Sequence, residues 1–85
     1  MKWELIIANR ARRAIRDLPR TDGEQILDAL EEMRTDPYTG DIKFLKGTNR
    51  ALRRRVGLWR ILFEVLTDRR IVVVEDVERR GSHIY

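Results

Sequence analysis

The chain has 85 residues, 38% charged and 42% hydrophobic, which suits a single small domain (residues 1–85) with a modest core. It contains no cysteine and one histidine, which excludes a disulfide framework and a cysteine metal site and argues against a zinc site. Its apolar runs are too short for a signal peptide or a membrane span, so we expect a cytoplasmic protein without a membrane segment. We also expect no cofactor and no bound metal.

A short strand and a first helix are predicted at the N-terminus. Residues 2–8 alternate with the period of two that indicates a strand. Asn9 can then cap a helix that Pro19 ends. The apolar residues of this helix fall at helical spacing: Ala11, Ala14, Ile15 and Leu18. Its arginines are most simply a solvated face, with RNA contact as the alternative reading.

A second helix is predicted from a capping box, in which Thr21 and Glu24 satisfy amide groups at the helix start. Its apolar stripe packs against the core and consists of Ile26, Leu27, Leu30 and Met33. Asp36-Pro37 ends the helix, because the residue before a proline disfavours the helical conformation.

The strongest strand signal lies in the stretch from Leu52 to Val65. Every odd position from Trp59 to Val65 is apolar, so these side chains share one face and Arg60 lies on the other. Gly57 lies between this run and the preceding one, where it allows a tight turn or a bulge. The two runs are therefore predicted to pair as antiparallel strands.

Further strands complete the predicted fold. Residues 42–46 form a short extended piece, residues 67–70 a hairpin connection and residues 71–74 an interior strand, after which residues 76–80 turn polar. The order predicts an α+β two-layer sandwich: an N-terminal strand, a helical hairpin and a three- or four-stranded, mainly antiparallel sheet. The helices cover one face and leave the other open.

Positive charge is concentrated in the middle of the chain. Residues 41–60 hold seven basic and one acidic side chain, whereas residues 1–40 hold seven and eight and residues 61–85 hold four and five. By strand alternation, Arg53 and Arg55 share the open face with Arg60, and Arg54 lies opposite. Neighbouring guanidinium groups repel one another, so a surface that gathers them favours a polyanionic partner such as nucleic acid.

These residues resemble the motifs of the RelE/ParE toxin superfamily, and of its RelE branch most. The resemblance rests on Lys46-Gly47, the run Leu52–Val65, the run Val77–Arg80 and Tyr85. It implies an endoribonuclease that needs no metal and cuts mRNA in the ribosomal A site. It also implies a cognate RelB-like antitoxin that silences the toxin in a hetero-oligomer. The implied reaction is attack of a ribose 2′-OH on the adjacent phosphate, which leaves a 2′,3′-cyclic phosphate.

The resemblance also assigns roles to individual residues. Arg60 matches the arginine that stabilises the transition state, and Arg53 and Arg55 match a basic pair that grips the RNA backbone. Arg80 matches an arginine that acts as acid or phosphate ligand, and Tyr85 an aromatic residue that stacks on the reacting nucleotide. The wider set expected to contact RNA is Lys43, Lys46, Arg50, Arg53 and Arg54.

The general base stays open at this point. In some members of the superfamily the basic pair matched by Arg53 and Arg55 is lysine and serves as base, but an arginine is a poor proton acceptor near neutral pH. His83 is the one side chain whose ordinary pKa suits proton transfer, so it is a candidate acid or base. Glu64, on the same strand face as Arg60, is a second candidate base.

Two other functions fit the same resemblance. The protein could be a ParE-like inhibitor of DNA gyrase, which acts by binding and not by cleavage. It could also be a catalytically decayed relative that keeps the fold and only binds an antitoxin. A supercoiling assay separates the first alternative from the nuclease, and overexpression without growth inhibition would favour the second.

Overall fold

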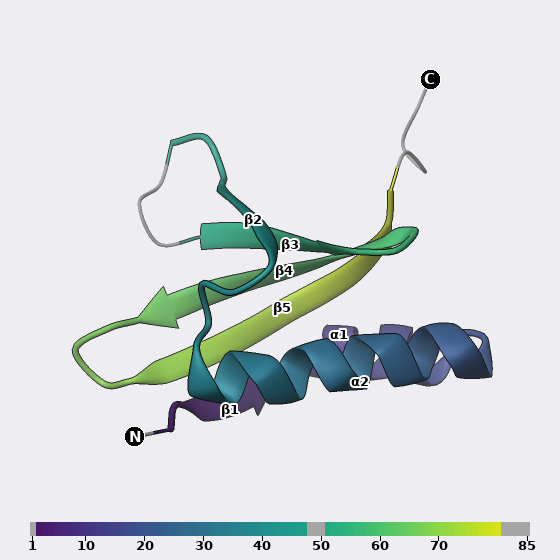
Figure 1. Ribbon diagram of the computed structural model, residues 1–85, viewed down its shortest axis with the longest axis horizontal. Coiled ribbons are helices and arrows are strands. Elements are labelled where there is room, and N and C mark those ends of the chain that lie inside the picture. The colour runs from purple at the N-terminus through teal and green to yellow at the C-terminus, as the bar shows by residue number, and fades with distance from the viewer. Residues whose placement is uncertain (1, 48–50, 81–85) are drawn as a thin grey trace.

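Two helices lie on one side of a mixed sheet (Figure 1). The computed structural model describes residues 2–47 and 51–80. Its elements are β1 (Glu4–Ile7), α1 (Asn9–Arg16), α2 (Arg20–Thr35), β2 (Asp41–Phe44), β3 (Ala51–Val56), β4 (Trp59–Leu66) and β5 (Ile71–Arg79). Within these ranges the sheet has five strands in the order β1-β5-β4-β3-β2. β1 runs parallel to β5, and the other neighbouring strands are antiparallel.

This architecture confirms the predicted α+β class. The predicted N-terminal strand is part of the same sheet, where it pairs with the last strand of the chain from Glu4 against Ile71 to Ile7 against Val74. β5 is thus an interior strand between β1 and β4, as its apolar start predicted. Neither α1 nor α2 is long and apolar enough to cross a membrane.

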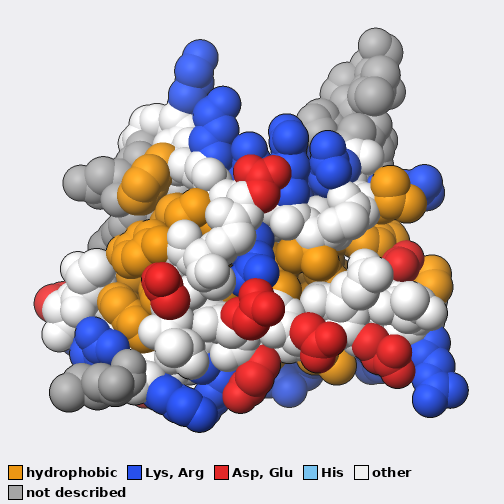
Figure 2. Space-filling model, viewed as in Figure 1, with side chains coloured by type: hydrophobic (Ala, Val, Ile, Leu, Met, Phe, Trp, Pro, Cys, Tyr) orange, Lys and Arg blue, Asp and Glu red, His pale blue; other side chains and the backbone are white. Residues whose placement is uncertain are grey.

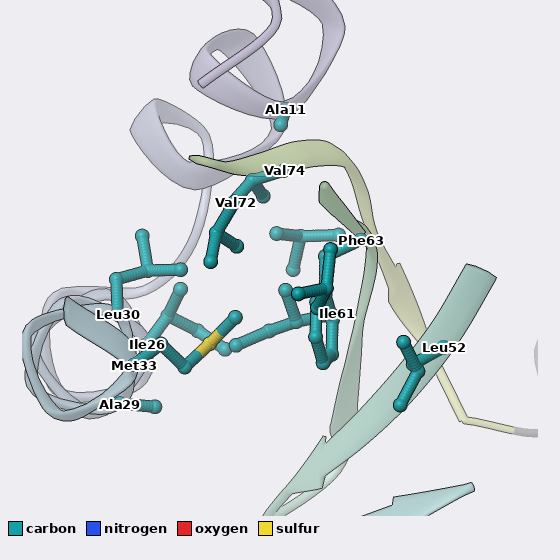
Figure 3. Packing of buried hydrophobic residues seen from close by; sticks show 12 residues of the cluster. Ala11, Ile26, Ala29, Leu30, Met33, Leu52, Ile61, Phe63, Val72 and Val74 are labelled. Carbon is teal, nitrogen blue, oxygen red and sulfur yellow. The ribbon is translucent and has the colours of Figure 1, made fainter. Parts of the chain in front are cut away.

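The core lies between the helices and the sheet (Figure 3). The odd positions of β4 point into it as predicted, with Phe63 only 1% exposed. Its members are Ala11 of α1, Ile26, Ala29, Leu30 and Met33 of α2, and Leu52, Ile61, Phe63, Val65, Val72, Val74 and Val77 of the strands. The apolar stripe of α2 therefore packs as expected, except that Leu27 is 52% exposed.

Both predicted helix starts are wrong in detail. Ala8, not Asn9, is the N-cap of α1, and no side chain caps the helix. Pro19 is the N-cap of α2, and its carbonyl accepts a hydrogen bond from the Gly23 amide at 2.8 Å. Thr21 therefore lies inside the first turn, where the capping box cannot form. The predicted end at Asp36 is confirmed: its φ of −149° and ψ of 103° are extended.

A bulge in β5 changes which side chains face the core. Val72 and Val74 are buried at even positions, but the next buried residue is Val77. Leu62 pairs with Asp76 and Phe63 with Val74, which leaves Glu75 as the extra residue. The strand thus extends to Arg79, beyond the predicted 71–74, and its polar end belongs to the sheet. After the bulge, Asp76 and Glu78 share the open face with Arg60.

Gly40 and Gly47 both have positive φ values, +86° and +82°, but their surroundings differ. A Cβ atom on Gly40 would lie 2.7 Å from Nε of Arg54, whereas no described atom lies within 4 Å of one on Gly47. Arg54 cannot easily move, because it is 8% exposed and donates hydrogen bonds to Ala29 and Glu32. A glycine is therefore required at position 40 for two reasons, the positive φ and the close approach of the Arg54 side chain.

The matched substitutions Gly40→Ala and Gly47→Ala separate these two effects. We expect Gly47→Ala to lower the free energy of unfolding by about 1 kcal/mol, from the left-handed backbone conformation alone. Gly40→Ala should cost at least about 1 kcal/mol more, because the added methyl group displaces a held side chain. Urea denaturation of both variants measures the difference; equal losses would mean that Arg54 moves aside freely.

Candidate active site

The turn between β3 and β4 brings the predicted arginines together. Val56 pairs with Trp59, so the connection is the two-residue turn Gly57-Leu58, and Gly57 has a φ of +58°. This register places Arg55 directly opposite Arg60 on the open face. The prediction that the two side chains gather on one sheet surface is confirmed.

The same face continues this row of charges across two more strands. On β5, Glu78 lies directly opposite Arg60, and on β2, Asp41 lies directly opposite Arg55. The order across the sheet is therefore Asp41, Arg55, Arg60 and Glu78, with two arginines between two carboxylates. A carboxylate thus lies beside each arginine and offsets part of its positive charge. The row can therefore present two arginines to an anion without leaving their charges wholly unbalanced.

Arg60 is held by a defined pair of hydrogen bonds. Its Nε and Nη2 atoms donate to Oε1 of Glu78 at 3.1 and 3.0 Å. The two side chains are 29% and 36% exposed, so solvent reaches the pair. Hydrogen bonding through Nε as well as Nη2 restrains the plane of the guanidinium group, which a single contact would not do.

Arg80 completes the group from the end of β5. Its backbone amide donates to the Leu58 carbonyl at 2.7 Å, and its Nη1 atom donates to the Gly57 carbonyl at 2.8 Å. These bonds tie the chain after β5 to the β3–β4 turn. A hollow of about 370 Å³ results, lined by Arg55, Leu58, Arg60 and Arg80. Three guanidinium groups around one hollow suit a phosphate and its negative oxygens.

Comparison with known proteins identifies the family of this chain. No family model matches the chain. Over 83 residues the chain is 32% identical to a curated protein described as "Putative toxin RelE1", from Methanocaldococcus jannaschii, and the match covers 94% of this chain and 92% of that protein. The chain belongs to the RelE toxin family. The predicted resemblance to the RelE branch is thereby confirmed.

Solved RelE structures share the fold. The archaeal RelE–RelB complex from Pyrococcus horikoshii OT3 gives a TM-score of 0.84 at 21% identity and covers 96% of this chain and 99% of that chain. The RelB–RelE antitoxin–toxin complex from Methanococcus jannaschii gives 0.75 at 26% identity, over 91% and 92% of the two chains. The RelE fold thus spans nearly the whole protein.

Three further predicted RNA contacts of this RelE-family chain, Arg53, Lys43 and Lys46, do not line the hollow. Arg53 is on the open face, but its Nη1 atom donates to Asp41, to Oδ1 at 3.3 Å and to the carbonyl at 3.1 Å. Lys43 pairs with Arg53 across β2 and β3 and is exposed, as is Lys46 beyond the end of β2. These cations extend the basic surface away from the hollow.

Arg54 does not belong to the RNA-facing group, which corrects the prediction. It points to the helix side, where it is 8% exposed. Its Nη1 atom donates to the Ala29 carbonyl at 3.3 Å and its Nη2 atom to Oε1 of Glu32 at 2.6 Å. Strand alternation had placed Arg54 opposite its neighbours, so this outcome follows from its position. Arg54 joins β3 to α2 and is a structural residue.

The surface over α2 differs in charge from the strands of this RelE fold. In the space-filling view, acidic side chains gather over α2, while several Lys and Arg side chains project from the strands above it (Figure 2). The exposed acids of α2 are Glu24, Asp28, Glu31 and Glu32. The basic open face of the strands therefore suits a polyanion better than the acidic surface over α2 does.

Three predicted residues, Arg50, His83 and Tyr85, lie outside the described residues. Their assigned roles stay predictions. Among residues 2–47 and 51–80 no group of three or more His, Cys, Asp or Glu side chains could hold a metal ion.

Glu78 is the residue of the site that sequence reasoning missed. The sequence alone gave no sign of its place, because only the structure shows that the buried valines change from even positions, Val72 and Val74, to the odd position of Val77. Such a change of phase marks a bulge, and a bulge moves every later side chain to the other face. Glu78 thus reaches the open face beside Arg60.

Proposed function

We propose that the protein is a toxin that cuts mRNA in the ribosomal A site. The observation that carries the proposal is the arrangement of Arg55, Arg60 and Arg80 around one hollow on the open face of a RelE fold. Anionic phosphorane oxygens develop during RNA cleavage, and fixed guanidinium groups stabilise such charge.

The proposed reaction is attack of the ribose 2′-OH on the adjacent phosphorus, with cleavage of the bond to the 5′-oxygen. The product is a 2′,3′-cyclic phosphate and a free 5′-hydroxyl group. In this scheme Arg60 stabilises the phosphorane, Arg55 and Arg53 hold the RNA backbone, and Arg80 binds phosphate or protonates the leaving group. Tyr85 would stack on the reacting nucleotide, and His83 is a candidate proton carrier.

The chemistry of the hollow supports the proposed dependence on the ribosome. The described residues that line the hollow are three arginines and a leucine, and arginine neither accepts a proton nor orders a flexible RNA chain by itself. A ribosome that presents the mRNA in a fixed conformation would supply the orientation that this small surface lacks.

We further propose that a cognate RelB-like antitoxin binds and silences the protein in a hetero-oligomer in the cytoplasm. The support is the family: the similar RelE chains of Pyrococcus horikoshii and Methanococcus jannaschii were solved in complexes with RelB. Co-expression with a candidate RelB-like antitoxin from the same organism, followed by purification of one tagged component, tests this. Recovery of the toxin alone would contradict it.

Primer extension on a reporter mRNA in a purified translation system tests the nuclease. We expect cuts within A-site codons that appear only when ribosomes are present. A 2′-deoxy substitution at the cut position should abolish them, because the nucleophile is missing. Normal translation with no cutting would overturn the proposal, and gyrase supercoiling would then be measured.

A further inference from the structure

We propose that Glu78 is a positioning residue, which holds the guanidinium group of Arg60 in the orientation required at the edge of the hollow. This inference rests on the proposed cleavage and names a further residue for it. Glu78 does not line the hollow; it acts through Arg60, with which it shares the two hydrogen bonds from Nε and Nη2.

The geometry of the pair suits orientation better than stability. Both donors lie on one edge of the guanidinium group and converge on a single carboxylate oxygen, at 3.1 and 3.0 Å. This arrangement fixes the rotation of the group about its last side-chain bonds. Because the partners are 29% and 36% exposed, solvent screens their attraction, and little folding energy is expected from it.

The bulge in β5 is what delivers Glu78 to this place. Val77, its preceding neighbour, is 6% exposed in the core, so Glu78 points to the open face. Without the extra residue at Glu75, the alternation set by Val72 and Val74 would turn Glu78 inward and Val77 outward. Bulges next to functional sites commonly re-aim a side chain in this way.

The charges on either side of Arg60 explain why a positioning residue is useful. Arg55 lies directly across from Arg60, so the two guanidinium groups are neighbours on the open face. Two guanidinium groups on adjacent strands repel each other, and this repulsion pushes Arg60 away from Arg55 and from the hollow. Glu78, opposite Arg60 on the next strand, opposes that motion.

Two substitutions at Glu78 test the inference in single-turnover cleavage on ribosomes. Glu78→Ala removes the acceptor, and we expect the rate to fall about 100-fold, as misplaced catalytic groups do. Glu78→Gln keeps an acceptor oxygen and should cleave at least about tenfold faster than Glu78→Ala. Glu31→Ala, which removes an exposed carboxylate from α2, is the matched control and should leave the rate unchanged.

Binding separates positioning from a merely structural role. Removal of a negative charge beside a phosphate site should leave the affinity for ribosome-bound 2′-deoxy mRNA equal or higher, while cleavage slows. In an Arg60→Ala background, Glu78→Ala should change the rate less than about threefold, because no guanidinium group is left to orient. If Glu78→Ala slowed cleavage in this background as much as it does in the wild type, the inference would be overturned.

Other outcomes also decide the matter. A Glu78→Ala cleavage rate within about twofold of the wild-type rate overturns the inference. A Glu78→Gln rate as slow as that of Glu78→Ala overturns it in favour of a proton-accepting carboxylate.

If the wild type cuts nothing, the proposed function fails, and hydrogen exchange of the Arg60 Nε–H group, measured by NMR, tests whether Glu78 positions Arg60. Slow exchange that becomes fast in Glu78→Ala supports it; equal exchange overturns it.

Discussion

Arg60→Ala is expected to slow mRNA cleavage about 10²- to 10³-fold, the usual loss when one fixed donor to a developing oxyanion is removed. Arg60 lies in the centre of the charged row and lines the hollow together with Arg55 and Arg80. The measurement is single-turnover cleavage of a reporter mRNA in a purified translation system, with products resolved by primer extension.

The loss should occur without loss of the fold. Arg60 and Glu78 form a partly exposed pair, so its removal should change the free energy of unfolding by no more than about 1 kcal/mol. Arg13→Ala, which removes an exposed arginine of α1, is the matched control and should cleave like wild type. A cleavage rate for Arg60→Ala within about threefold of that control would refute the assigned role.

Phe63→Ala is expected to lower the free energy of unfolding by about 3–5 kcal/mol, as truncation of a buried aromatic ring does. Phe63 lies on β4, in the middle of the sheet, and is 1% exposed. A small domain has only about 5–15 kcal/mol of total stability, so the variant should be partly unfolded near physiological temperature. Urea denaturation, followed by circular dichroism, measures the change.

Phe44→Ala is the control for this effect, because it removes the same ring from a different environment. Phe44 lies on the edge strand β2 and is 52% exposed, so its substitution should change stability by less than about 0.5 kcal/mol. Equal losses in the two variants would contradict the described packing. A changed denaturant slope in Phe63→Ala alone would indicate an altered unfolded state.

Much of the fold could be predicted because its signals are local. The alternation from Trp59 to Val65 specifies one buried and one open face whichever strands lie alongside. The Asp36-Pro37 step ends α2 through a steric clash between adjacent residues. Helix starts were less predictable: Asn9 and Thr21 are good capping residues, but Ala8 and Pro19 occupy the N-cap positions.

The candidate site was predictable in part for the same reason. Arg55 and Arg60 are separated by one short turn, so their pairing follows from the hairpin. Arg80 is distant in sequence, and the family motif alone suggested it; its bonds to the Gly57 and Leu58 carbonyls are tertiary contacts. Arg54 was assigned to RNA on charge, although alternation already placed it on the helix side.

The sequence by itself determined the α+β class, the two faces of the central hairpin and the family, because periodicity, proline and short motifs act through neighbouring residues. Only the tertiary structure decided that β1 joins β5, that a bulge at Glu75 turns Glu78 to the open face, and that Glu78 holds Arg60. These features depend on which strands pair and in what register, and strand register is a property of two distant segments together.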